Sequence, residues 1–121
     1  MAKPNIAGVG KALRKRALAY PEATEEFPWG ESAFKVKGKT FVFMRANASE
    51  LSFSVKLPQS RAAALKLPGS ESTHYGLGAK GWVTLNPTSK TPIDALYALI
   101  DESYRAVAPK RVLEKLKAAP R

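Results

Sequence analysis

Residues 29–56 read WGESAFKVKGKTFVFMRANASELSFSVK and predict three antiparallel strands. Phe34 and Val36 alternate with lysines, and after a glycine the run of strand-forming residues resumes over residues 40–45. Strict alternation returns over residues 51–56, where leucine, phenylalanine and valine share one face and two serines and a lysine share the other. We therefore expect a hairpin and a third strand that place one face of a sheet in the core and the other in water.

Helical patterns lie on both sides of these strands. The predicted helices cover residues 9–19, 59–66 and 91–108, and a second hairpin joins strands at residues 72–75 and 82–85. The stripe of the first helix that should face the sheet consists of Val9, Leu13, Ala17 and Tyr20. The core is expected to contain Phe41 and Phe43 or their alternating neighbours, with Leu51, Phe53, Val55, Leu96 and Ile100.

The last helix has the best-defined start. Thr91 is placed as its N-cap, Pro92 as its first helical residue, and Asp94 three residues after the cap, which resembles a capping box. Pro109 breaks the pattern. The basic segment 109–121 is predicted to be a mobile tail with at most a short extra helical turn.

An acidic connector at residues 22–26 and an aromatic turn at residues 27–30 join the first helix to the sheet. The resulting order is helix, three strands, helix, two strands, helix. It predicts an α+β two-layer sandwich, in which helices cover one face of a five-stranded antiparallel sheet and leave the other face exposed. The length of 121 residues fits a single domain over residues 1–121, with residues 1–8 as a loose N-terminus.

The composition is that of a globular chain, with 45% hydrophobic and 25% charged residues. No run of about 18 apolar residues exists that could span a membrane. Lys11 and the three cations at residues 14–16 interrupt any signal-peptide pattern. Cysteine is absent, which excludes disulfides and thiol catalysis and fits a reducing compartment. We therefore expect a cytoplasmic protein without a membrane partner.

The chain carries a formal charge of +10, from 20 Lys and Arg against 10 Asp and Glu. Such a charge attracts polyanions through counterion release, although solubility alone also tolerates it. The cations are segregated, since Glu50 is the one acidic residue from residue 32 to residue 66. Seven cations share that segment: Lys35, Lys37, Lys39, Arg45, Lys56, Arg61 and Lys66. A polyanionic partner is the first hypothesis.

Alternating lysines on the first hairpin form a predicted cationic wing, with Lys35 and Lys37 on one strand face and Lys39 at the turn. Phosphate contacts from such a wing give affinity without reading sequence. Trp29 and Trp82 would stack on unpaired bases or, alternatively, pack half-buried. The candidate nucleic-acid-binding residues are Lys35, Lys37, Lys39, Arg45, Lys56, His74, Tyr75, Lys80 and Trp82.

For two of these candidates, a purely structural role is the alternative to ligand binding. His74, beside the glycine-rich loop at residues 76–81, would contact a ligand or serve as a hydrogen-bonded structural residue. The loop itself would present backbone amides and Lys80 to a phosphate, or be a flexible hairpin, because it lacks the spacing of nucleotide-binding loops.

Catalysis and metal binding find little support. His74 is the only histidine, cysteine is absent, and no pair of acidic residues has a spacing typical of general acid and base catalysis. The acidic cluster Glu22, Glu25, Glu26 and Glu31 is interpreted as a solvated loop or as an internal partner for the basic first helix. We expect no enzyme activity, no metal and no cofactor.

Several short segments occur in a fixed order: LAYPEA at residues 18–23, WG at residues 29–30, FKV and GK at residues 34–39, GWVTL at residues 81–85 and ESY at residues 102–104. Together they resemble the MmcQ/YjbR family of small bacterial proteins. The resemblance covers residues 12–116. It implies a two-layer fold shared in outline with type III secretion chaperones and often compared with frataxin-like proteins, and a description as DNA-binding.

Two functions follow from these observations. The first is a non-enzymatic nucleic-acid-binding module, with DNA as the favoured ligand, that uses basic hairpins on its sheet. The alternative is a protein-interaction module that holds an acidic partner on its exposed sheet face, by analogy with the secretion-chaperone fold.

Overall fold

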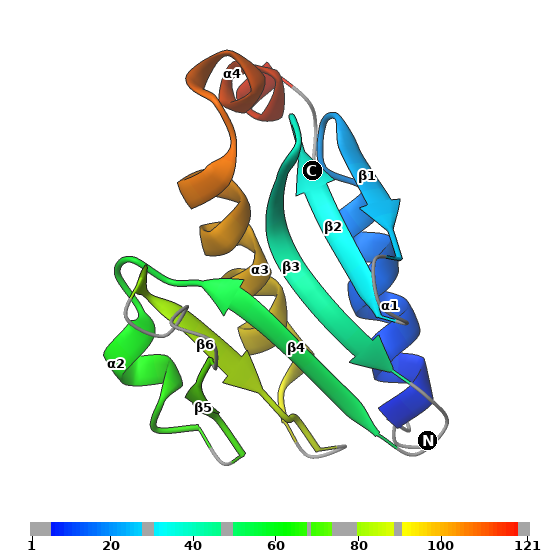
Figure 1. The fold of residues 1–121 in the computed structure, drawn as a ribbon, viewed down its shortest axis with the longest axis vertical. Helices are drawn as coiled ribbons and strands as arrows, with labels where there is room; N and C mark the ends of the chain where they lie inside the picture. The colour runs from blue at the N-terminus through cyan, green and yellow to red at the C-terminus, as the bar shows by residue number, and fades with distance from the viewer. Residues whose placement is uncertain are drawn as a thin grey trace.

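A computed structural model describes residues 6–27, 31–46, 50–67, 69–73, 80–88 and 91–118 (Figure 1). These residues form four helices and six strands. In chain order they are α1 (Ile6–Leu18), β1 (Ala23–Glu26), β2 (Ser32–Val36), β3 (Lys39–Ala46), β4 (Leu51–Lys56), α2 (Arg61–Ala64), β5 (Glu71–Ser72), β6 (Trp82–Leu85), α3 (Ile93–Val107) and α4 (Lys110–Ala118). The predicted α+β class is confirmed.

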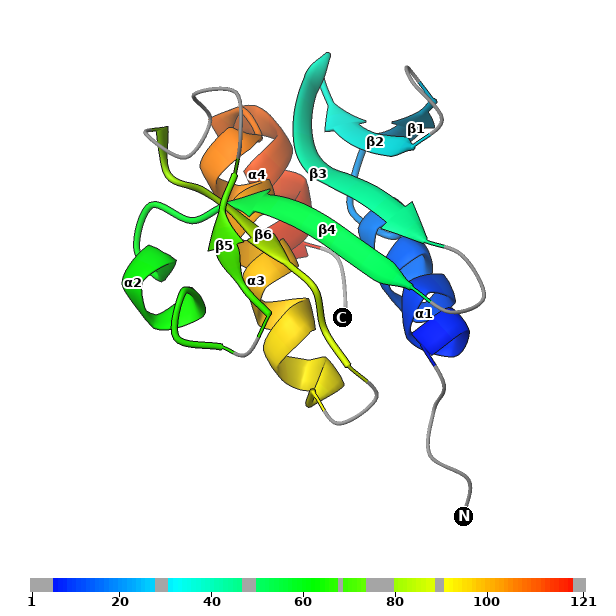
Figure 2. The ribbon, with the colours of Figure 1, turned by 60° about the horizontal axis from the view of Figure 1, so that its bottom comes forward.

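All six strands form one antiparallel sheet in the order β1-β2-β3-β4-β6-β5. Helices α1 and α3 lie side by side against one face of it, whereas the opposite face carries no helix among the described residues (Figures 1 and 2). We call the uncovered face the open face. The predicted layering is therefore correct for the described part of the chain.

The prediction of five strands was wrong, because the acidic connector is a strand. β1 pairs with β2 over all four of its residues, from Ala23 opposite Val36 to Glu26 opposite Ala33. Glutamate has a weak strand preference, which is why the sequence pattern does not reveal this strand. Its pairing is a tertiary effect, since β2 offers a free edge.

The stripe expected on the first helix is buried, from Val9 to Tyr20. This helix begins at Ile6, so residues 6–8 are not part of a loose terminus. The core residues expected from periodicity are also buried, with the exception of Phe43, whose register opposite Ser54 places it on the open face. These buried residues are Phe41, Leu51, Phe53, Val55, Leu96 and Ile100.

An irregular register between β2 and β3 explains why Phe41 and Val42 are both fully buried. Phe34 pairs with Val42 and the next residue pairs with Thr40, which leaves Phe41 without a direct partner. Such a bulge turns two consecutive side chains away from strict alternation. The Phe41 ring then packs edge-on against Tyr104 of α3, with 5.1 Å between ring centroids.

Helix α3 is fastened to the sheet by hydrogen bonds as well as by its apolar stripe. The fully buried hydroxyl of Ser103 donates to the carbonyl oxygen of Phe41 at 2.5 Å and accepts from the backbone N–H of Lys56 at 2.8 Å. The hydroxyl of Tyr104 donates to the carbonyl oxygen of Pro21 at 2.7 Å. These two neighbouring residues thus tie α3 to β3, to β4 and to the chain that enters β1.

The expected N-cap of α3 was wrong by one residue. Pro92 occupies the N-cap position with an extended backbone and makes no side-chain cap. The hydroxyl of Thr91 instead accepts a hydrogen bond from the backbone N–H of Thr88 at 3.0 Å. The second helix is likewise shorter than expected, since α2 covers four residues.

The expected mobile tail is largely a helix. α4 begins directly after Pro109, and the N–H groups of Val112 and Leu113 both bond to the carbonyl oxygen of that proline. Val112 is fully buried and Leu113 packs against the core. α4 therefore places Lys110, Arg111 and Lys115 on a helix at one end of the molecule (Figure 1).

Candidate functional site

The turn between β2 and β3 consists of Lys37 and Gly38, which both have positive φ angles, 51° and 79°. Two such residues make the tight turn that suits the twist of a hairpin, and glycine adopts this conformation without steric cost. The turn projects Lys37 at the end of the sheet. Its ammonium group lies 2.6 Å from the carboxylate of Glu22.

The same carboxylate binds a lysine from the other end of the chain. Oε2 of Glu22 accepts a hydrogen bond from Nζ of Lys115 in α4 at 2.5 Å, while Oε1 faces Lys37. Glu22 therefore joins the hairpin turn to α4. Figure 1 shows these two elements together at one end of the molecule.

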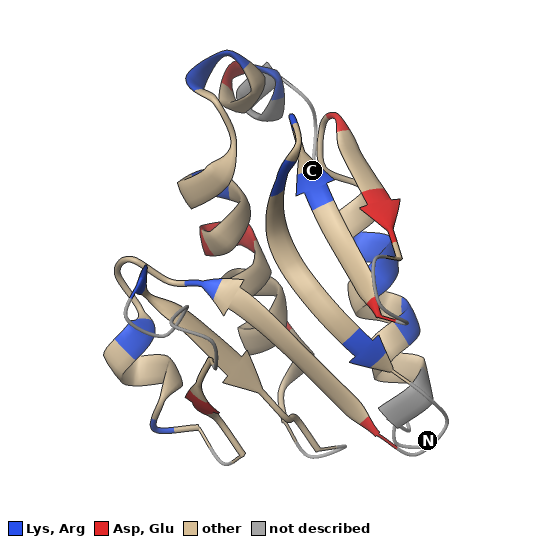
Figure 3. Cartoon of the chain, viewed as in Figure 1, with Lys and Arg blue, Asp and Glu red and all other residues tan. Residues whose placement is uncertain are grey.

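We call this surface the basic end and define it by the cations of the turn and of α4. They are Lys37, Lys39, Lys110, Arg111 and Lys115. Two carboxylates accompany these cations, Glu22 just before β1 and Glu114 in α4. Lys39, Lys110 and Arg111 are exposed and form no ion pair within the described ranges. Figure 3 shows the cations of the turn and of α4 gathered there.

The first turn of α4 contains Lys110 and Arg111 and no acidic residue. Cations at a helix N-terminus oppose the positive end of the helix dipole, and each costs a few tenths of a kcal/mol to about 1 kcal/mol of helix stability. Folding alone thus gives no reason for this pair of cations. The combined positive field of these two cations is suited to an anion.

The electrostatic state of Glu22 follows from its two partners. Hydrogen bonds from Lys115 and then Lys37 lower the pKa of Glu22 from 4.5 to about 2. Because the folded-state pKa is depressed, the stabilisation from this carboxylate is fully present above pH 4.5 and is lost as the pH falls toward 2. Glu22 is therefore ionised at neutral pH.

The three lysines of the predicted cationic wing lie in different places on the sheet. Lys35 projects from the open face and pairs with Glu26 at 3.2 Å, whereas Lys37 pairs with Glu22 at the end of the sheet. Lys39, the first residue of β3, is exposed. The three lysines therefore do not form one continuous row.

Two further cations pair with glutamates of residues 25–31. Arg14 of α1 binds Glu25 at 2.7 Å, which confirms the alternative of an internal partner for the basic first helix. Arg45 at the end of β3 lies 3.8 Å from Glu31. Lys56 and Lys80, by contrast, form no ion pair among the described residues.

Trp82 lies on the open face but is only 7% exposed. Its ring packs against Phe43 with 5.6 Å between centroids. The packing role considered for Trp82 is therefore confirmed. The other proposed base-contacting residues, Trp29, His74 and Tyr75, lie outside the described residues.

The centre of the open face is neutral and rich in hydroxyl groups. The hydroxyls of Ser54 and Thr84 lie 2.8 Å apart, and those of Thr73 and Thr84 lie 3.0 Å apart. Figure 3 shows that the charges of this face lie mostly toward the strand ends and edges.

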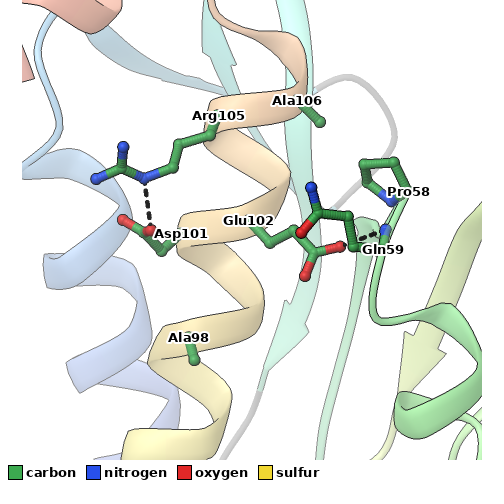
Figure 4. Close-up of a pocket in the computed structure, with 7 residues that line it drawn as sticks. All are labelled: Pro58, Gln59, Ala98, Asp101, Glu102, Arg105 and Ala106. Atoms are coloured by element: carbon green, nitrogen blue, oxygen red, sulfur yellow. Dashed lines mark hydrogen bonds and ion pairs between the residues drawn. The ribbon is translucent and has the colours of Figure 1, made fainter.

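A pocket of about 370 Å³ lies between α3 and the turn before α2 (Figure 4). Its lining residues are Pro58, Gln59, Ala98, Asp101, Glu102, Arg105 and Ala106. Glu102 accepts the backbone N–H groups of Gln59 at 2.9 Å and Ser60 at 3.0 Å, and Asp101 binds Nε of Arg105 at 2.7 Å. The carboxylates of this pocket thus have structural partners within the chain.

The described residues contain no group of three or more acidic, histidine or cysteine side chains placed to hold a metal ion. Within the same part of the chain, no helix combines the length and the apolar character needed to cross a bilayer. What the sequence did not reveal is the joining of α4 to the hairpin. The spacing of Val112, Leu113 and Leu116 after a proline was the signal for the helix, but nothing local indicated the bridge through Glu22.

A family model described as YjbR matches residues 18–106. Among solved structures, a Deinococcus radiodurans protein with a DUF419 domain superposes with a TM-score of 0.73 at 21% identity, covering 96% of this chain and 91% of that one. A Pseudomonas syringae protein superposes with a TM-score of 0.65 at 13% identity, covering 80% and 97%. No curated protein matches the sequence. At these identities the two structures show a shared fold.

Proposed function

We propose that this chain, which belongs to the YjbR family, is a non-enzymatic protein that binds nucleic acid, with duplex DNA as its favoured ligand. The observation that carries the proposal is the basic end. Two elements distant in sequence are held together there, and three of their cations, Lys39, Lys110 and Arg111, have no carboxylate partner among the described residues.

Phosphate groups are the ligands that fit this surface. Lysine and arginine on a rigid helix and a tight turn lose less conformational freedom on binding than the same residues on a mobile tail. The contacts available are to the nucleic-acid backbone, so affinity should depend little on sequence. Base reading would need further groups beyond the basic end.

The direct test is the salt dependence of binding to a short labelled DNA duplex, measured by fluorescence anisotropy. Three to five phosphate contacts predict that log affinity falls with log salt with a slope of about −2.7 to −4.5. Two duplexes of unrelated sequence should give the same slope. Single strands and RNA serve as comparisons, since a lower affinity for both supports duplex DNA as the preferred form.

The absence of binding to any of these nucleic acids at low salt, with a protein shown to be folded by circular dichroism, would refute the proposal. So would an affinity that does not change with salt, because phosphate contacts release counterions.

A second function is favoured by the open face. The neutral, hydroxyl-rich centre of this face and the partly exposed Phe43 suit a polypeptide better than a polyanion. Three cations at its margin, Lys35, Arg45 and Lys56, suit acidic side chains of such a partner. A protein partner that remains bound at high salt, and is lost on Phe43→Ser but retained on Lys110→Gln, would support this alternative.

A further inference from the structure

Glu22 sits at the centre of the basic end, between two lysines that come from opposite parts of the chain. Its two carboxylate oxygens each face one ammonium group, that of Lys37 at 2.6 Å and that of Lys115 at 2.5 Å. The side chain of Glu22 is 27% exposed, and those of Lys37 and Lys115 are 39% and 54% exposed. The ion pairs can therefore open to solvent without unfolding of the protein.

The backbone at this site is also unusual. Glu22 has a φ angle of 59° and Lys37 a φ angle of 51°, and they are the only non-glycine residues with positive φ in the described part of the chain. Such left-handed conformations are strained for residues that have a Cβ atom, and strain of this kind clusters at functional sites. Both partners of one ion pair are thus held in strained conformations.

We propose that, in the free protein, the carboxylate of Glu22 lies where a phosphate of the nucleic acid binds. It acts there as an internal counter-ion, which the phosphate displaces when the nucleic acid binds. The inference rests on the proposed function, and it concerns the same basic end. A carboxylate and a phosphodiester each offer two anionic oxygens to a pair of ammonium groups. The arrangement of Lys37 and Lys115 around Glu22 is therefore also suited to a phosphate.

Competition between Glu22 and a ligand phosphate lowers the affinity of the site for anions and makes the site selective for polyanions. A single small anion gains little by displacing Glu22, because its binding must replace both ion pairs. A polyanion that is already held by Lys39, Lys110 and Arg111 brings the next phosphate to the site at high effective concentration. The low pKa of Glu22, about 2, means that the competition persists at neutral pH.

The test is the Glu22→Gln variant, with Glu114→Gln as its matched control. Glutamine removes the charge of Glu22 but keeps a side-chain oxygen that accepts a hydrogen bond from either lysine. Glu114→Gln removes the same charge from an exposed residue of α4 that forms no ion pair among the described residues. Exposed ion pairs contribute little to stability, so both variants should fold.

Duplex affinity is measured for the protein and both variants across salt. Glu22→Gln is expected to tighten binding by about 5-fold for one gained phosphate contact, or by about 30-fold for two, near 0.15 M salt, and to steepen the slope by about 0.9 to 1.8. Glu114→Gln should change affinity by less than about 2-fold, since it opens no new phosphate contact. Equal effects of the two variants, or weaker binding of Glu22→Gln, would overturn the inference and leave the proposed function intact.

Immobilised heparin separates failure of the inference from failure of the proposed function. If no variant binds a nucleic acid, the proposed function fails, and the salt needed for elution from heparin then tests the anion site alone. Later elution of Glu22→Gln than of Glu114→Gln supports an anion site that Glu22 occupies. Identical elution of the two variants overturns it.

Discussion

Replacing Lys39, Lys110 and Arg111 together by glutamine is expected to weaken binding to duplex DNA on the order of 100-fold near 0.15 M salt. Each residue is exposed and free of ion pairs among the described residues, so each is available for one phosphate contact. Losing three contacts should flatten the slope of log affinity against log salt by about 2.7. Anisotropy titrations over a range of salt measure both quantities.

A matched control removes the same charge elsewhere. Lys11, Lys15 and Arg61 are exposed on α1 and α2, and their joint replacement by glutamine also removes three charges. This control should weaken binding only a few-fold, because it acts through the overall field. If both triple variants weaken binding equally, net charge alone explains the affinity and the basic end is not the site.

Ser103→Ala is expected to lower the free energy of unfolding by about 3 kcal/mol, a large part of the stability of a small domain. The Ser103 hydroxyl is fully buried and serves two backbone groups, the carbonyl oxygen of Phe41 and the N–H of Lys56. Alanine leaves both groups without that partner, and a buried polar group left unsatisfied costs about 1–3 kcal/mol. Urea unfolding followed by circular dichroism measures the loss.

Ser54→Ala is the control for this variant. Ser54 exchanges a hydrogen bond with the Thr84 hydroxyl on the open face, where Thr84 keeps Thr73 as a second partner. Its replacement should cost less than about 1 kcal/mol because the Thr84 hydroxyl remains satisfied. A cost for Ser103→Ala no greater than that for Ser54→Ala would show that the buried hydroxyl does not hold α3 in place.

The parts of the fold that the sequence predicted are those with a strong local period. Alternation in β4 and the apolar stripes of α1 and α3 place residues such as Leu13, Phe53 and Ile100 correctly in the core. β1 was missed because Glu25 and Glu26 are poor strand formers, and their conformation depends on pairing with β2.

The candidate site was only partly visible in the sequence for a related reason. Individual lysines can be counted along the chain, but their availability depends on which carboxylates the fold brings to them. The contact between Glu22 and Lys115 spans 93 residues, and no spacing rule indicates such a pair. The helix that carries Lys115 was expected to be mobile because its many charged residues hide the apolar contact made by the fully buried Val112.

The hydrogen bonds from α3 also have a consequence for amide hydrogen exchange. Three backbone N–H groups outside this helix, those of Lys56, Gln59 and Ser60, donate to the side chains of Ser103 and Glu102. These amides are protected by helix side chains rather than by a sheet or helix ladder. Their exchange with deuterium therefore reports the detachment of α3 from the sheet, a sub-global opening that can be followed without labelling the helix itself.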